Sequence, residues 1–164
     1  MRTRYRMMWV RLGATVLVGV VAGVTIAASA QGTPGAAPRL SVRSTEYGKA
    51  LFGPSGKVLY VFGADRATTS RCYGVCASAW PPLLTKTTKT ASLAGAGVQT
   101  RLLGTTKRKN GTLQVTYNGH PLYYYEGDKV GQVKCQHANM HGGLWLILKP
   151  TGQPNTTKGK MMHM

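Results

Sequence analysis

Acidic side chains are scarce in this chain. Four Asp and Glu residues stand against 21 Lys and Arg residues in a chain of 164, which gives a formal net charge of +17 at pH 7. So few carboxylates argue against a glycosidase, because that chemistry needs two of them facing each other across a cleft. The excess of positive charge favours polyanionic partners, since a strongly basic surface attracts them over long distances.

The signatures of several functional classes are missing as well. The sequence contains no Gly-x-Ser-x-Gly nucleophile elbow and no His-Glu-x-x-His zinc-protease motif. It shows no signature of a nucleic-acid-binding fold. His120 stands next to Pro121 and is interpreted as a turn residue rather than a general base. The sequence therefore predicts a protein that is not an enzyme, needs no cofactor and has no specific nucleic-acid partner.

The N-terminal segment, residues 1–30, has the features of a secretory signal peptide. Four arginines within residues 1–11 precede the uncharged, apolar residues 12–30, which end in Ala28-Ser29-Ala30. Signal peptidase recognises this order of a basic start, an apolar stretch and a small-x-small end. Cleavage would leave 17 basic and four acidic side chains, a formal charge of +13. Membrane association is expected only if this segment stays uncleaved, since its length approaches that of a span.

The middle of the chain contains one unit twice. Seven pairs of positions at one constant offset carry equivalent side chains: Gly48/Gly111, Gly56/Gly119, Leu59/Leu122, Tyr60/Tyr123, Phe62/Tyr125, Asp65/Asp128 and Cys72/Cys135. We assign repeat one to residues 40–100 and repeat two to residues 101–150. The Gly/Pro/Ala-rich residues 31–39 are expected to form a flexible leader. Residues 151–164 are expected to form a polar tail, which ends in Met161, Met162, His163 and Met164.

Both copies have the pattern of β-strands joined by tight turns. "TLQVTYNGHPLYYY" places two strand-like runs around Asn118-Gly119, a dipeptide that suits a two-residue hairpin turn. "KALFGPSGKVLYVF" is its counterpart, with a longer turn at residues 53–56. Residues 145–148, "WLIL", fit a closing strand, and short helical turns are expected within residues 70–79 and 91–96. The predicted fold is mainly β, with two pseudo-equivalent three-stranded β-meander repeats packed as one small domain.

Three cysteines leave the disulfide pairing open. Thiols of exported proteins are usually paired, and Gly74 lets the chain turn so that Cys72 can reach Cys76. The alternative is a long bridge from Cys135 to one of them, which the loop-entropy model would favour. We favour the local bridge, because Cys72 and Cys135 occupy equivalent positions, and such positions touch only near the axis of a two-fold arrangement.

The segment "CQHANMH", residues 135–141, is rich in metal-type side chains. Two His, one Cys and a weak axial Met make a type 1 copper site, and the candidates are His120, Cys135, His137, Met140 and His141. Copper is therefore the alternative cofactor, and the soft ligands of the tail would suit Cu(I). The repeat already accounts for the position of Cys135 without any metal. We therefore expect a surface loop that leads into Gly142-Gly143, with Trp145 buried behind it.

Several motifs together resemble a known family. "LYVFGAD", "CYGVCASAWPPL", "YNGHPLYYYEGD" and "GGLWLILKPTG" are similar to the bacterial secreted repeat family, whose members are described as predicted lipoproteins with a Tyr-x-aromatic-x-x-Asp motif. The resemblance covers residues 46–152. It implies an extracytoplasmic protein with tandem copies and no agreed activity. On this pattern the motif residues are Tyr60, Phe62, Asp65, Tyr123, Tyr125 and Asp128. The chain lacks a cysteine at the signal cleavage site, which argues against lipid anchoring.

These observations lead to one preferred function and one alternative. We expect a secreted cell-envelope module that binds an anionic cell-wall polymer or an envelope protein through a basic, Tyr-rich β surface. Asp65 and Asp128 are interpreted as turn residues whose carboxylates accept backbone N–H bonds. The alternative is an extracytoplasmic copper-binding or redox protein that uses the segment around Cys135.

Overall fold

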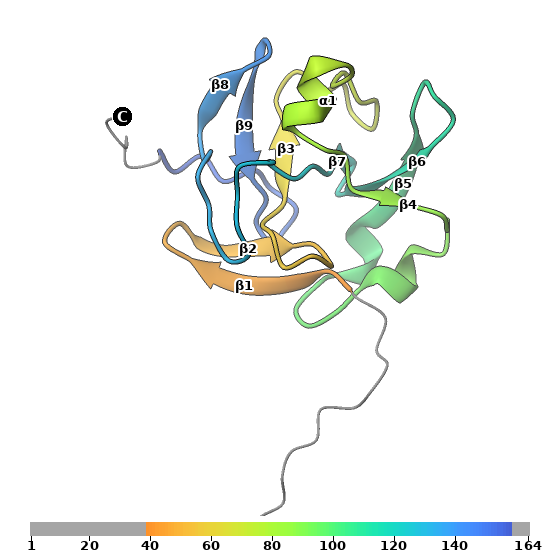
Figure 1. Ribbon diagram of the computed structural model, residues 1–164. Helices are drawn as coiled ribbons and strands as arrows, with labels where there is room; N and C mark the ends of the chain where they lie inside the picture. Colours follow the sequence, from red (N-terminus) through yellow and green to blue (C-terminus); the bar gives the residue numbers. More distant parts are fainter. Residues whose placement is uncertain (1–38, 159–164) are drawn as a thin grey trace, which may run out of the picture. The chain divides into compact units, whose positions relative to one another are not determined.

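The computed structural model describes residues 39–158 (Figure 1). The predicted signal peptide, most of the predicted leader and the Met/His-rich end of the tail lie outside these residues. Strands predominate in the described part, which confirms the mainly β class. The element order is β1 (Ser41–Thr45), β2 (Gly48–Phe52), β3 (Tyr60–Phe62), α1 (Val75–Ala79), β4 (Leu84–Thr85), η1 (Thr90–Leu93), η2 (Thr100–Leu102), β5 (Leu103–Lys107), β6 (Leu113–Tyr117), β7 (His120–Pro121), β8 (Ala138–Met140) and β9 (Gly143–Ile147).

Strand pairing joins the two copies. In the first copy β1 and β2 form an antiparallel hairpin, and in the second copy β5, β6 and β7 form a three-stranded meander. β3 of the first copy pairs with β9 of the second, beside which it lies in Figure 1, and β4 pairs with β6. The expected three-stranded meander is thus complete only in the second copy. In the first, the chain makes a single bridge at Val58 and then continues into the sheet of the other copy.

A pseudo-two-fold axis passes between two equivalent tyrosines. The backbone N–H of Tyr60 donates to the carbonyl of Tyr123 at 2.9 Å, and the N–H of Tyr123 donates back to Tyr60 at 3.0 Å. An antiparallel pair that exchanges both bonds has a local two-fold axis at its centre. Two further cross-copy bonds obey the same symmetry, from the Leu148 N–H to Leu59 at 3.2 Å and from the Leu83 N–H to Leu122 at 2.9 Å. The repeat in the sequence is therefore a repeat in space.

The core on this axis is aromatic. Trp80 and Trp145 are both fully buried and stack with 3.9 Å between ring centroids and 4° between ring planes. Trp145 is buried as the sequence predicted. The spacing from Trp80 to Trp145 slightly exceeds the repeat offset, so the second copy contains a short insertion between its cysteine and its tryptophan. Burial of such large side chains is a major source of stability in a small β domain.

The turn residues take the conformations that the sequence indicated. Asn118 and Gly119 have φ angles of 49° and 79°, as a type I′ hairpin turn requires. Gly56 has a φ of 77°, and its N–H donates to the Gly53 carbonyl at 2.9 Å. A side chain is strained at such φ angles, which explains the glycine at both 56 and 119.

Regular helix is limited to short pieces. The turn of helix expected within residues 70–79 is α1, and the helix expected at residues 91–96 is the 3₁₀ segment Thr90–Leu93. Across residues 39–158 no helix has both the length and the apolar character that crossing a membrane requires.

The start of the predicted polar tail packs against the body. Asn155 is 1% exposed, and its side-chain amide donates to the Tyr47 carbonyl at 2.8 Å. The Gln136 side chain donates to the carbonyls of Asn155 and Thr157 at 2.6 and 2.8 Å. The domain therefore continues past the boundary at residue 150 that composition suggested. Side-chain hydrogen bonds hold this segment, and polar composition alone gives no sign of them.

Candidate functional site

The motif tyrosines and aspartates bond across the two copies. The Tyr60 hydroxyl donates to the Asp128 Oδ2 at 2.8 Å, and the Tyr123 hydroxyl donates to the Asp65 Oδ2 at 2.8 Å. Tyr60 and Tyr123 are both fully buried. Each motif is therefore completed by the tyrosine of the other copy.

The other carboxylate oxygens close the loops of their own copies. Asp65 accepts the backbone N–H of Arg71 on Oδ1 at 2.7 Å, and Asp128 accepts that of Lys134 at 2.9 Å. This is the turn role that the sequence suggested for both acids. The cross-copy partner was not predicted, because an offset within one sequence gives no information about which copy a side chain contacts.

The aromatic positions of the motif hold the tryptophan pair. Phe62 stacks on Trp145 with 4.2 Å between ring centroids, and Tyr125 packs against Trp80 at 4.7 Å. Tyr60 and Tyr123 meet the same tryptophans edge to face. The six motif residues therefore hold the two copies together. The motif tyrosines do not form the expected Tyr-rich surface, because Tyr60 and Tyr123 are buried and Tyr125 is half-buried.

Burial shifts the titration of these groups upward. Desolvation raises the pKa of both Asp65 and Asp128 above the usual value, and the bound tyrosine and backbone donors offset part of the rise. The pKa values of Tyr60 and Tyr123 are also raised, first by burial and then by the nearby carboxylates. Both phenols therefore stay protonated and serve as donors.

A buried arginine distinguishes the first motif from the second. Arg108 is 5% exposed, and its guanidinium donates to the Cys72 carbonyl at 2.6 Å, to the Ser70 hydroxyl at 2.9 Å and to the Gln114 side chain at 2.5 Å. Ser70 lies 2.8 Å from the Tyr123 hydroxyl. Since that hydroxyl has one proton, which goes to the carboxylate, Ser70 donates to it.

A continuous polar chain thus runs from the Arg108 guanidinium through Ser70 and Tyr123 to Asp65. This network was not predicted from the sequence. Its only sign was the Lys107-Arg108-Lys109 run, which gives no indication that the middle cation is buried.

The cysteines pair locally. Cys72 and Cys76 form a disulfide with 5.2 Å between their α-carbons, so the favoured pairing is confirmed. Cys135 is a free, half-buried thiol whose backbone N–H points to the Tyr60 hydroxyl at 3.5 Å. Burial raises the pKa of the Cys135 thiol.

The residues proposed as copper ligands have separate structural roles. The His137 N–H donates to the Trp145 carbonyl at 2.9 Å, and the Met140 carbonyl accepts the Trp145 indole N–H at 3.1 Å. His141 lies in the exposed turn between β8 and β9, whereas His120 lies on β7. Within residues 39–158 no group of three or more His, Cys, Asp or Glu side chains is placed to hold a metal ion. Residues 161–164 lie outside the described part, and copper binding stays a prediction.

A family model decides the identity of the repeat. It matches twice, at residues 41–84 and 104–149, which together make up more than half of the chain, and its description is a secreted repeat of unknown function. The chain belongs to this family. The two matches coincide with the two copies that the offset revealed, and the description supports the predicted extracytoplasmic location. No curated protein and no solved structure matches the chain.

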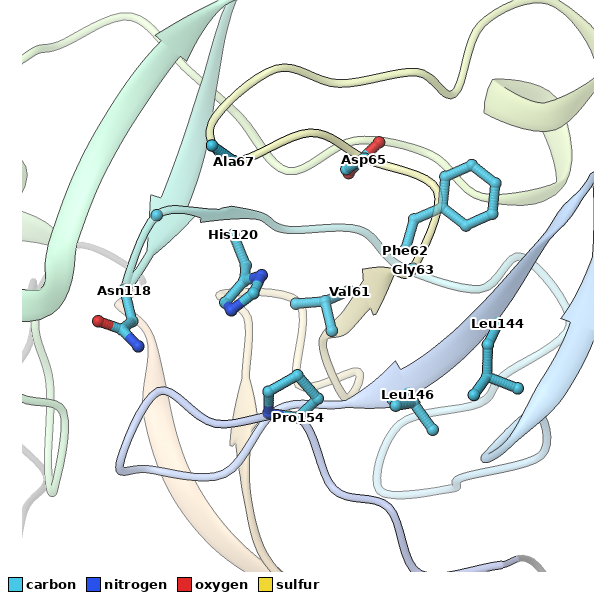
Figure 2. A pocket seen from close by; sticks show the side chains of 11 residues that line it. Val61, Phe62, Gly63, Asp65, Ala67, Asn118, His120, Leu144, Leu146 and Pro154 are labelled. Carbon is cyan, nitrogen blue, oxygen red and sulfur yellow. The ribbon is translucent and has the colours of Figure 1, made fainter.

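One hollow of this secreted repeat protein lies between the copies (Figure 2). It measures about 260 Å³ and is lined by Val61, Phe62, Gly63, Asp65, Ala67, Asn118, Gly119, His120, Leu144, Leu146 and Pro154. In Figure 2 the His120 ring points into the space above Pro154. Partial burial lowers the pKa of His120, which favours the neutral imidazole at pH 7. The walls are mainly apolar, and the polar groups gather at the Asn118 and His120 end.

Proposed function

We propose that the protein is a non-catalytic extracytoplasmic module that binds a phosphate-rich anionic polymer of the cell wall on its basic exterior. The proposal rests on the inward orientation of two of the four acidic side chains, which leaves the exterior strongly basic. Asp65 and Asp128 turn inward and use both carboxylate oxygens in internal hydrogen bonds. Exposed acids in residues 39–158 are therefore reduced to Glu46 and Glu126. The exposed basic residues are Arg39, Arg43, Lys49, Arg66, Arg71, Lys86, Lys89, Arg101, Lys107, Lys109, Lys129, Lys134 and Lys158.

Several basic residues belong to two loops that are joined to each other. These loops, residues 71–73 and 107–109, are called the basic loop pair. The Lys109 N–H donates to the Tyr73 hydroxyl at 3.1 Å, and the Arg108 guanidinium lies 4.4 Å from the centre of the Tyr73 ring. Arg71, Lys107 and Lys109 of these loops are exposed, and the Lys109 ammonium lies 5.5 Å from the centre of the Tyr73 ring. A fixed loop junction holds these charges close together without a large entropic cost on binding.

The symmetry-related junction has a different charge. At the repeat offset, Arg71 corresponds to Lys134, whereas Lys107 and Lys109 correspond to Ser44 and Glu46. The second junction therefore has one basic side chain and one acidic one. The contrast supports the basic loop pair as the principal contact for a polyanion, since charges of one sign act together over a Debye length of about 8 Å.

Retention on immobilised linear polyphosphate tests the proposal. Wild-type protein should bind at low ionic strength and elute steeply with added salt. Replacing Lys107 and Lys109 by Gln should weaken binding about tenfold, equal to about 1.4 kcal/mol. The matched control replaces Lys86 and Lys89, which are also exposed, and should weaken binding less than about threefold.

Two outcomes would count against the proposal. Absence of wild-type retention at low salt would leave solubility as the role of the charge. Equal losses in the two double variants would show that binding follows net charge and has no principal site. An immobilised carboxylate polymer, polyglutamate, distinguishes a preference for phosphate from general attraction to anions.

A further inference from the structure

The hollow shown in Figure 2 has a symmetry-related counterpart in the other half of the domain. In that counterpart the side chain of Tyr124 fills the equivalent space. Val61 and Tyr124 are equivalent, since each follows the first motif tyrosine of its copy. Val61 pairs with Leu146, the residue after Trp145. The Tyr124 N–H donates to the carbonyl of Pro81, the residue after Trp80, at 2.8 Å. The two positions therefore have equivalent backbone surroundings.

In the filled counterpart, the Tyr124 ring extends to the turn at residues 53–56. Its hydroxyl lies so close to Gly53 that a β-carbon at that position would clash with it. Two residues of this turn, Ser55 and Gly56, correspond to Asn118 and Gly119. Asn118 and Gly119 line the hollow on the Val61 side. The space that Tyr124 occupies in one half thus corresponds to open space in the other, because valine lacks the ring.

The lining of the hollow restricts what could enter it. Leu144, Leu146 and Val61 supply apolar walls that suit a flat ring. Asp65 also borders the hollow, but both of its carboxylate oxygens already accept hydrogen bonds from Arg71 and Tyr123. A charged ligand would find no free partner of opposite sign there. The Asn118 side-chain N–H donates to the Gly152 carbonyl at 3.1 Å, so the Asn118 Oδ1 and the His120 ring remain as hydrogen-bonding groups at one end.

We propose that this hollow is a binding site for a small neutral phenol, a molecule with the size of a tyrosine side chain. Its ring lies against Val61 and Leu146, and its hydroxyl lies toward Asn118 and His120. The ligand supplies in the first half what Tyr124 supplies in the second. This proposal is independent of polyanion binding, which uses other loops.

Titration with p-cresol, observed by methyl NMR of the full chain, tests the site. Wild-type protein should show saturable shifts at the Val61, Leu144 and Leu146 methyls, with a Kd on the order of 1 mM or lower. Cross-relaxation between the cresol ring and these methyls should place the ligand without any mutation. Toluene, which lacks the hydroxyl, should bind about tenfold more weakly if the polar end takes part.

Two matched variants use the symmetry. Val61→Tyr should fill the hollow with its own ring and abolish the cresol shifts, whereas Tyr124→Val should open a second hollow and add a second set of saturable shifts that the wild type lacks. The methyl spectrum itself shows whether each variant is folded. If Val61→Tyr is unfolded, the cross-relaxation result and Tyr124→Val decide the matter. Wild-type shifts that do not saturate, or saturable shifts confined to other methyls, would overturn the proposal, as would cresol binding unchanged in folded Val61→Tyr.

Discussion

The loop that follows Asp65 and the loop that follows Asp128 have the same backbone frame and different contents. In each, the carboxylate accepts an N–H from six residues further along and a hydroxyl from the opposite tyrosine. The Asp65 loop contains a disulfide and packs on the buried Arg108, whereas the Asp128 loop contains the free Cys135. Hydrogen bonds to the backbone and the motif side chains maintain the duplicated frame. The remaining positions differ between the copies, and the disulfide and Arg108 support the Asp65 loop alone.

The largest difference between the loops should come from Arg108. Arg108→Met keeps the apolar stem but leaves the Cys72 carbonyl and the Ser70 and Gln114 side chains without a buried donor. It also removes the charge that favours ionised Asp65. We expect a loss of about 3 kcal/mol in the free energy of unfolding. Urea denaturation measures it, and Lys107→Met, which alters an exposed neighbour, should change stability by less than about 0.5 kcal/mol. A loss below about 1 kcal/mol for Arg108→Met would mean that water replaces the guanidinium.

The cysteines should differ next. Replacing Cys72 and Cys76 together by Ser should cost about 2 kcal/mol, because their bridge closes a short loop in the unfolded chain. Cys135→Ser should cost less than about 1 kcal/mol, since that thiol is half-buried and unbridged. Thermal melting of both variants gives the comparison, and peptide mapping without reductant checks the bridge. A main cross-link that contains Cys135 would contradict the assignment.

The two motif tyrosines should differ by a smaller amount. Tyr123→Phe removes a hydroxyl that bonds both Asp65 and Ser70, whereas Tyr60→Phe removes one that bonds Asp128 and has a long 3.5 Å contact with the Cys135 N–H. We expect losses of about 2 and about 1 kcal/mol respectively in urea denaturation. Equal losses would show that Ser70 finds another partner at no cost.

The smallest effect concerns pH. Burial raises the folded-state pKa of Asp65 and Asp128 above the unfolded value, so the folded chain holds these protons more tightly. Their contribution to stability should therefore grow as pH falls through the raised pKa values and should be complete below the unfolded pKa of about 3.9.

The urea midpoint of the wild type, measured from pH 7 to pH 3 and compared with that of Asp128→Asn, isolates one of these groups. The wild type should gain on the variant as pH falls. If the wild type loses ground instead, hydrogen bonds to the carboxylate outweigh its desolvation, and the folded pKa is lowered.

Several features could be predicted from residues because their causes are local. Asn118-Gly119 takes positive φ angles that few other dipeptides accept, and the Cys72–Cys76 bridge needs only a turn at Gly74. The role of Asp65 and Asp128 in their own loops is local as well. The hollow could not be predicted, because it results from a valine placed opposite residues far along the chain.

The sequence by itself determined the β class, the duplication, the family and the excess of positive charge, since repeated spacing, turn chemistry and composition are properties of the chain order. Only the tertiary structure decided that Tyr60 serves Asp128 and Tyr123 serves Asp65, that β3 joins the sheet of the other copy, and that Arg108 is buried. A side chain within one repeat has the same local sequence whether it contacts its own copy or the other. The choice is made by packing around the pseudo-two-fold axis, where the stacked Trp80 and Trp145 bring both copies into one core.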